Sequence, residues 1–277
     1  MSETTTSVPE SLFDDHPVVF LHGWCGHADE VESIRSALPG PVLTLPWMPA
    51  PGSCDLEAWP LEDRAPGEAE NAMLAFANEV REQVRQTILD AGFKGATLID
   101  HALGGELACV LAADPSLEFK RVVLLDSSTP IPDEHRVDYV DQMLGWVDRA
   151  ATGGRLVAQA GWIAQASSWV PDFFSLEDQG PIRLRIERRF LFSPVAEAAM
   201  MIGGAVQWPI NESLSKLDCE IHALSGDPGR MPVDALREMR PDAKIETCDD
   251  TGHYVHLFAA ERTRAWLERI FSASAAT

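Results

Sequence analysis

Short, mainly apolar runs alternate along the chain with longer segments whose apolar residues recur at helical spacing. The short runs are rich in β-branched and aliphatic residues, which is typical of strands covered on both faces. They comprise residues 18–22, 41–47, 96–101, 121–126, 220–226 and 243–249. The helical patterns comprise residues 28–38, 68–91, 103–113 and 258–271. This alternation predicts an α/β fold with a mostly parallel central sheet flanked by helices.

One long interval interrupts the alternation. Between residues 128 and 211 no convincing strand occurs, and helix-like segments are separated by glycines and prolines. We therefore predict a core in two parts, 1–127 and 212–277, with a helical cap at 128–211 between them. The cap is rich in large apolar side chains. Three of these are candidate contacts for an aromatic or polyketide-like substrate: Trp146, Trp162 and Trp169.

Composition excludes several classes of protein. The 277 residues are 45% hydrophobic and 23% charged, which is enough to bury a core and too apolar for a disordered chain. Acidic residues outnumber basic ones by 43 to 22, and the net charge of −21 repels phosphate backbones and anionic lipids. We expect a small hydrophobic substrate as partner, and neither nucleic acid nor membrane. The oligomeric state stays open, with a homodimer as one alternative.

Targeting and cofactor signals are missing from the sequence. Residues 1–16 lack the basic start and apolar stretch of a signal peptide, and no apolar run reaches the ~18 residues of a membrane span. The five cysteines are an odd number without a CxxC, which argues against a disulfide framework and a zinc site. We therefore expect a cytoplasmic protein. No metal-ligand or nucleotide-binding motif occurs, so neither metal nor cofactor is expected, and abundant Arg and Ala favour a bacterial gene.

Three short motifs lie where predicted strands end. HGW (22–24) follows the first strand, DHALGG (100–105) joins the third strand to a helix, and TGH (251–253) follows the last strand. A sharp turn between strand and helix with two glycines is the frame of a nucleophile elbow. A histidine after the last strand can reach back over the edge of the sheet as a general base.

On these motifs the chain resembles the α/β-hydrolase superfamily from residue 18 to residue 271. LHGW resembles the oxyanion-hole loop, DHALGG the GHSxGG elbow, RVVLLDSS the strand after the elbow helix, and GHYVHL the loop of the catalytic histidine. The resemblance implies the α/β-hydrolase fold, with the cap inserted after the strand that ends at Asp126. The antiparallel hairpin that opens many members is not expected, because the first parallel strand comes so early in this chain.

The resemblance also implies roles for the residues that match its motifs. His253 is expected to be the general base, and a carboxylate must accept its Nδ1–H so that Nε2 faces the substrate. Asp126 stands at one place from which relatives supply this acid. Asp227 is the alternative, although it directly follows Gly226 and so comes earlier than in the usual Gly-x-x-Asp of the family; we prefer Asp126.

The remaining site residues come from the first two motifs. The main-chain N–H groups of Trp24 and Leu103 would form the oxyanion hole. The side chains of Trp24, His22 and His101 are candidate substrate contacts, although both histidines also fit the architecture of their loops.

Two residues of the elbow depart from the family pattern. Ala102 occupies the nucleophile position, and a methyl group cannot attack a substrate, so covalent acyl transfer by this chain is excluded. Either Ala102 replaces the serine of a working hydrolase, or the mechanism needs no nucleophile; we prefer the first because the motifs around it are intact. Asp100 stands where the elbow usually has Gly, and we expect it to be a tolerated surface carboxylate, with a role in the site as the alternative.

Three functions follow as hypotheses. The first is a Ser-His-Asp hydrolase of a small hydrophobic ester, thioester, lactone or C–C substrate, here with Ala102 in place of the serine. The second is a cofactor-free histidine–aspartate enzyme, because GWC (23–25) and Asp126 resemble the dioxygenases of the same fold that cleave N-heteroaromatic rings. The third is a binding protein that kept the pocket and lost the chemistry.

Overall fold

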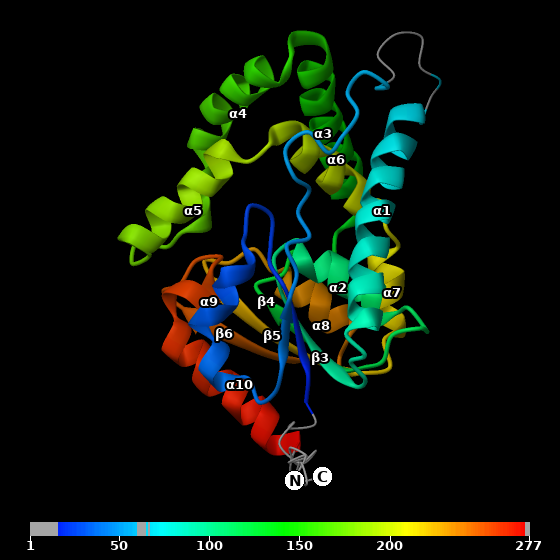
Figure 1. The fold of residues 1–277 in the computed structure, drawn as a ribbon. Helices are drawn as coiled ribbons and strands as arrows, with labels where there is room; N and C mark the ends of the chain where they lie inside the picture. Colours follow the sequence, from blue (N-terminus) through cyan, green and yellow to red (C-terminus); the bar gives the residue numbers. More distant parts are fainter. Residues whose placement is uncertain (1–15, 60–64, 66, 275–277) are drawn as a thin grey trace, which may run out of the picture.

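A six-stranded parallel sheet forms the centre of the protein (Figure 1). The computed structural model describes residues 16–59, 65 and 67–274. The strand order is β2-β1-β3-β4-β5-β6. The strands are β1 (Val18–Leu21), β2 (Val42–Thr44), β3 (Ala96–His101), β4 (Phe119–Leu125), β5 (Glu220–Asp227) and β6 (Lys244–Asp249). Each of them coincides with a run expected from the sequence.

Helices cover both faces of this sheet, and the side chains of the strands alternate between them. Val19 and Leu21 of β1 belong to a core formed with α1 (Glu68–Asp90) and α2 (Gly104–Ala112), whereas Val18 and Phe20 belong to a second core. That second core contains residues of α10 (Ala260–Ser274). The alternation follows from the two-residue period of a strand, and it explains why the strand sequences are apolar throughout.

Five shorter helices complete the core in the described part of the chain. They are α7 (Ile210–Lys216), α8 (Val233–Met239), α9 (Val255–Phe258) and a pair of 3-10 helices, η2 (Ala28–Ser33) and η3 (Arg35–Ala37). The prediction of a single helix at 28–38 is therefore wrong, because two short 3-10 helices lie there. His27 caps η2 by accepting a hydrogen bond from Asp29 N, while the Glu30 carboxylate accepts one from His27 N. The chain turns again at Ile34, which ends η2 and starts η3.

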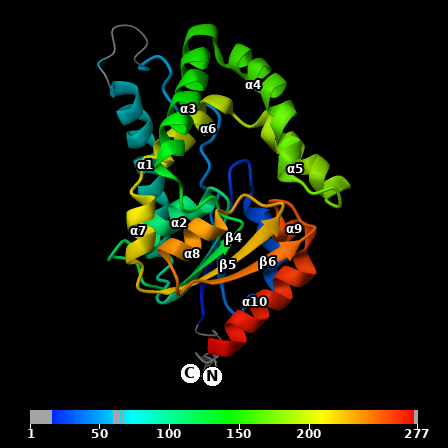
Figure 2. The same ribbon diagram turned by 180° about the vertical axis from the view of Figure 1, so that it is seen from behind.

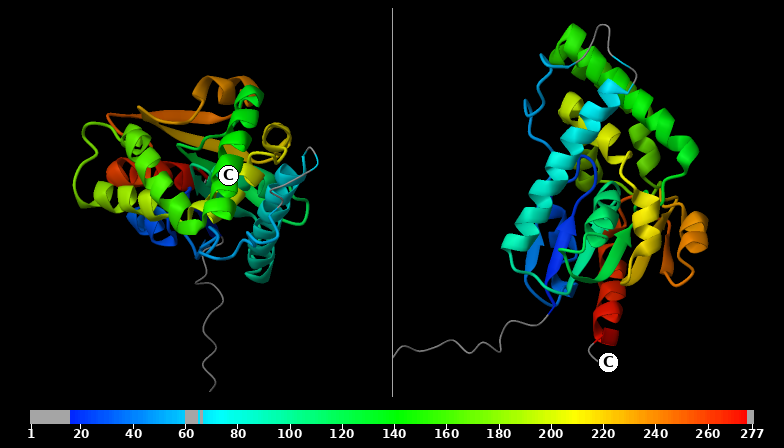
Figure 3. Two further views of the ribbon diagram at one scale, coloured as in Figure 1. Left: turned by 90° about the horizontal axis from the view of Figure 1, so that it is seen from above. Right: turned by 90° about the vertical axis from the view of Figure 1, so that its right-hand side faces the viewer.

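The cap lies over the carboxyl ends of the strands (Figures 1 and 2). It contains α3 (Asp133–Gly153), α4 (Arg155–Trp169), η4 (Val170–Phe173), α5 (Pro181–Phe192) and α6 (Val195–Ala205), all within the interval 128–211. The right-hand view of Figure 3 shows the same helices on one side of the sheet. Helix α7 begins inside the interval and ends beyond it, so the exact boundary at 211 stays a prediction.

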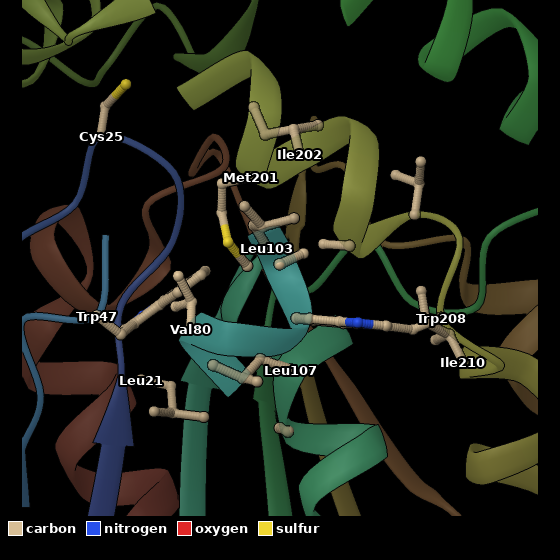
Figure 4. Packing of buried hydrophobic residues seen from close by; sticks show 14 of the residues in the cluster. Leu21, Cys25, Trp47, Val80, Leu103, Leu107, Met201, Ile202, Trp208 and Ile210 are labelled. Carbon is tan, nitrogen blue, oxygen red and sulfur yellow. The ribbon is translucent and has the colours of Figure 1, made fainter. Parts of the chain in front are cut away.

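Close packing joins α6 to the core. A Cβ at Gly204 would lie 2.1 Å from the carbonyl oxygen of Met73, so α6 approaches α1 at a distance that only glycine allows. Figure 4 shows Met201 of α6 extending toward Leu103, which directly precedes α2. The cap is therefore packed directly on the segment that follows β3.

Two sequence-based expectations concern membranes and targeting. No helix in the described ranges is long and apolar enough to cross a membrane. Residues 1–15, from which the lack of a signal peptide was inferred, lie outside the described residues.

Candidate active site

The turn between β3 and α2 has the geometry of an elbow. Ala102 has a φ of 51°, a left-handed conformation that costs a residue with a Cβ about 1 kcal/mol or more. The glycines that follow permit the close approach of neighbouring loops, since a Cβ at Gly104 would lie 2.4 Å from the carbonyl oxygen of Leu21 and one at Gly105 would lie 1.7 Å from Ser127 Oγ. Ala102 also borders a cavity between core and cap.

Asp126 and His253 meet at this cavity from the ends of different strands. Asp126 follows β4 with a φ of 42°, and its Oδ2 lies 2.7 Å from His253 Nδ1. The carboxylate also accepts hydrogen bonds from Gly226 N at 2.9 Å, Arg230 N at 2.7 Å and Ser225 Oγ at 3.2 Å. These donors compensate the burial of the carboxylate and fix its orientation. His253 borders the cavity together with Ala102.

The cap holds the loop of His253 through its main chain. His253 N donates to the carbonyl of Phe173 in η4 at 2.8 Å. The buried carboxylate of Asp178 accepts hydrogen bonds from Gly252 N and Ser175 N, both at 2.8 Å. A Cβ at Gly252 would lie 2.4 Å from the carbonyl oxygen of Phe173, so this contact requires glycine. The sequence analysis did not identify Asp178, because no local pattern links it to residues 252 and 253.

His101 supports the same loop from below. Its Nε2 lies 3.0 Å from the carbonyl oxygen of His253, and the two rings are 4.6 Å apart between centroids. Complete burial lowers the pKa of His101 well below its usual value, so the ring is neutral. Because its Nε2 faces a carbonyl, Nε2 carries the proton and Nδ1 does not.

The cavity has a volume of about 530 Å3, and its wall includes several aromatic side chains. Of the candidate substrate contacts, Trp24, Trp162 and Trp169 border it. The rings of Trp162 and Trp169 pack 5.2 Å and 5.9 Å from that of Trp24. The cavity also has polar groups in its wall, which the sequence analysis did not single out: Glu106, His135, Tyr139, Gln142, Asp172 and Arg230.

Three other candidate contacts do not border the cavity. His22 stacks on Trp47 with ring centroids 5.7 Å apart, and His101 lies beneath His253. Trp146 packs edge-on behind Trp162 at 5.4 Å. His101 and Trp146 therefore support residues of the wall, whereas His22 packs on Trp47, which does not border the cavity either. The structure brings none of the three to the cavity itself.

The two main-chain donors expected at an oxyanion hole are available. In the described part of the chain, neither Trp24 N nor Leu103 N donates a hydrogen bond to another residue. Both residues border the cavity, one in the loop after β1 and the other directly before α2. An oxygen held between them would sit next to the methyl group of Ala102.

The carboxylates named from the sequence differ from one another in their surroundings. The acid that contacts His253 is Asp126, whereas Asp227 is exposed at the end of β5, where its main chain pairs with Thr251. Asp100 is completely buried, so the expectation of a surface carboxylate was wrong. Neither of its oxygens has a hydrogen-bond partner among the described residues, and desolvation raises its pKa well above the usual value. The reason is its position in β3, on the face covered by α2.

One buried group of side chains has the composition of a metal site. Potential ligand atoms of Glu30, His101 and His256 lie within 4.8 Å of one another. The Glu30 carboxylate already binds the guanidinium of Arg189 at 2.9 Å, and a cationic neighbour opposes a metal cation. We therefore interpret the group as a hydrogen-bonded support of the His253 loop.

Comparison with known proteins agrees with this architecture. The model of the alpha/beta hydrolase family matches residues 18–266. The structure is similar to a thermophilic esterase from Thermogutta terrifontis, with a TM-score of 0.67 at 17% identity over 93% of this chain and 90% of that chain. It is also similar to the enol-lactonase from Burkholderia xenovorans, with a TM-score of 0.63 at 14% identity over 93% and 90% of the two chains. MenH from S. aureus has a TM-score of 0.65 at 14% identity over 93% of each chain. No curated protein sequence matches the chain.

Proposed function

The chain belongs to the α/β-hydrolase family, and from this premise we propose that it is an enzyme in which His253 takes a proton from a small, mainly apolar aromatic substrate. This reverses the preference drawn from the sequence motifs, because the contact between His253 and Asp126 requires no hydroxyl at position 102. The observation that carries the proposal is the 2.7 Å contact between His253 Nδ1 and Asp126 Oδ2. His253 borders the same cavity as Ala102, the residue at the nucleophile position of the elbow. The aromatic wall of Trp24, Trp162 and Trp169 supports the substrate class.

The dyad works through the tautomer of the imidazole. Asp126 accepts the Nδ1–H of His253, which leaves the lone pair on Nε2 as the base. When Nε2 takes the proton, the carboxylate stabilises the resulting imidazolium. Negative charge that develops on a substrate oxygen is stabilised by the N–H groups of Trp24 and Leu103. Since Ala102 offers no hydroxyl, the proton comes from the substrate, and no covalent intermediate forms at the elbow.

A second candidate is a serine-type hydrolase whose nucleophile is missing. It would act on a small hydrophobic ester, thioester, lactone or C–C substrate, and Ala102 would stand in place of the serine. The specific support is the elbow itself: Ala102 keeps the left-handed φ of 51° next to two unpaired N–H donors, although it has no hydroxyl to present. On this account Ala102→Ser restores activity by several orders of magnitude.

Proton transfer from carbon tests the first candidate. The probe is 2-tetralone, a bicyclic ketone whose C1–H is acidified by both the carbonyl and the ring. In D2O the protein should accelerate deuterium exchange at C1, followed by NMR, and His253→Ala should remove the acceleration. Exchange at the buffer rate with the unaltered protein would count against the proposal. Dioxygen uptake with N-heteroaromatic compounds tests whether the deprotonated substrate is then oxygenated.

The second candidate has a separate test. Ala102→Ser and the unaltered protein are treated with a fluorophosphonate and with nitrophenyl esters, and labelling is read by intact mass. Labelling and ester turnover by Ala102→Ser alone would support a hydrolase. An Ala102→Ser protein that is neither labelled nor active would eliminate it, and tight binding of apolar ligands without turnover would then leave a binding protein.

A further inference from the structure

Glu106 is a buried carboxyl group in the wall of the cavity. Glu106 lies in the first turn of α2, four positions after Ala102, and only 3% of its surface is exposed. Glu106, Ala102 and Leu103 all border the cavity. The side chain therefore faces the space in which we expect the substrate, on the same side as the elbow.

The carboxyl group has no hydrogen-bond partner among the described residues. Oε2 is buried and makes no hydrogen bond to any described residue. A buried polar group without a partner loses its hydration and gains nothing in return, so an apolar residue of similar shape would pack there at lower cost. An unpaired group of this kind at the wall of a cavity indicates a ligand that supplies the missing partner.

The surroundings of Glu106 favour its protonated form. Burial raises its pKa to about 8, and the positive charge of Arg136 on α3 only partly opposes this effect. Other titratable groups lie nearby. Asp100 of β3 and Cys109 of α2 are fully buried, and the cavity wall that Glu106 borders also contains His135, Tyr139, Asp172, Arg230 and His253. At neutral pH the group is therefore a carboxylic acid, with an O–H to donate.

We propose that Glu106 is a specificity-determining residue which donates a hydrogen bond to a carbonyl oxygen of the aromatic substrate. The inference rests on the proposed function, because it assumes the same cavity and the same ligand class. The hydrogen bond selects ligands that carry an acceptor and fixes their orientation relative to His253. Protonated carboxyl groups act in this way where an apolar site keeps them neutral.

Binding of a matched pair of probes tests the proposal without any turnover. 2-Tetralone and tetralin share the same bicycle and differ in the carbonyl oxygen. Their affinities are measured by quenching of tryptophan fluorescence, since Trp24, Trp162 and Trp169 border the cavity. At pH 6 the unaltered protein should bind the ketone about tenfold more tightly than the hydrocarbon. The preference should fall as pH rises through about 8, where Glu106 loses its proton.

Two variants separate donation from packing. Glu106→Met keeps the approximate shape and removes this donor, so its preference for the ketone should fall to the part that the main-chain N–H groups of Trp24 and Leu103 provide, and should no longer change with pH. Glu106→Gln keeps an N–H donor that does not titrate, so it should retain the preference at every pH. The pH series of the unaltered protein and Glu106→Gln stands on its own should Glu106→Met fold poorly.

The outcomes distinguish this inference from the function on which it rests. If both probes bind and Glu106→Met keeps the full ketone preference of the unaltered protein, the role of Glu106 is overturned while proton transfer by His253 is untouched. A preference that does not change with pH in the unaltered protein overturns it as well. If neither probe binds, the aromatic substrate class fails, and the role of Glu106 fails with it.

Discussion

Two regions around the cavity hold a buried carboxyl group in opposite ways. Directly after β4, Asp126 accepts hydrogen bonds from main-chain N–H groups and a serine hydroxyl at the end of β5 and just beyond it, and from His253. In the first turn of α2, Glu106 is buried with no hydrogen bond to its Oε2 in the described chain. A carboxyl group with donors is suited to orient a base, and one without donors is suited to remain protonated and donate. The different roles of the two carboxyl groups follow from their surroundings, and not from whether the residue is Asp or Glu.

The largest expected effect is the loss of the acceptor at His253. In Asp126→Asn the amide no longer compensates the imidazolium and favours the wrong tautomer, so exchange of 2-tetralone should slow by roughly a thousandfold or more. Asp227→Asn is the matched control, because Asp227 is exposed and its main chain pairs with Thr251. The exchange rate of this variant should equal that of the unaltered protein. Equal losses in the two variants would mean that the contact between Asp126 and His253 does not orient the base.

The next largest effect is on the pH dependence of stability through Glu106. Below pH 4.5, its usual pKa, folded and unfolded chains are both protonated at this site. Between pH 4.5 and about 8 only the unfolded chain releases the proton, so the free energy of unfolding falls as pH rises. Glu106→Gln has no carboxyl group at this position, so its free energy of unfolding does not fall for this reason. Relative to the unaltered protein, its free energy of unfolding should therefore rise by a few kcal/mol between pH 5 and pH 8. Urea denaturation at both pH values measures it, and a difference that does not change with pH would contradict a protonated Glu106.

A smaller effect is expected where the cap holds the His253 loop. Asp178→Asn weakens the acceptor of Gly252 N and Ser175 N, and the resulting misplacement of His253 should slow exchange about tenfold. The binding of tetralin should stay within a factor of two, because Asp178 does not border the cavity. Glu177→Gln, one position earlier and exposed, serves as control. An unchanged exchange rate in Asp178→Asn would show that the loop holds its position without the cap.

The smallest effect concerns the aromatic wall. Trp169→Phe keeps an aromatic ring with less area, so tetralin should bind severalfold more weakly. Trp146→Phe alters a ring that lies behind Trp162, and it should change stability more than affinity. Affinities from fluorescence titration compare the two, and a larger loss of affinity in Trp146→Phe would move the ligand to another part of the cap.

How far the sequence predicts this site depends on where each residue lies. Ala102, Asp126 and His253 all follow strands, and the carboxyl ends of parallel strands meet at one edge of the sheet, so their proximity could be inferred. Glu106 and Asp178 could not be found in this way. Their roles depend on the docking of α2 and the cap, which no local pattern encodes.

The case of Asp100 is different, because its position was readable and was missed. Leu98 and Asp100 lie two positions apart in β3 and therefore share a face of the sheet, and Leu98 is buried under α1 and α2. The sequence also did not predict the helix type at residues 28–38, where a capping box of His27 and Glu30 begins a 3-10 helix. The two-residue alternation of β3 therefore indicates that Asp100 is buried, whereas the comparison with the elbow motif had suggested a surface position.

The most direct test of the account compares deuterium exchange at C1 of 2-tetralone by the unaltered protein, His253→Ala and Ala102→Ser. If His253 is the base and no nucleophile is needed, the unaltered protein accelerates exchange, His253→Ala runs at the buffer rate, and Ala102→Ser exchanges about as fast as the unaltered protein. If exchange is not accelerated by the unaltered protein, while Ala102→Ser is labelled by a fluorophosphonate and hydrolyses esters, the account of a nucleophile-free base is contradicted.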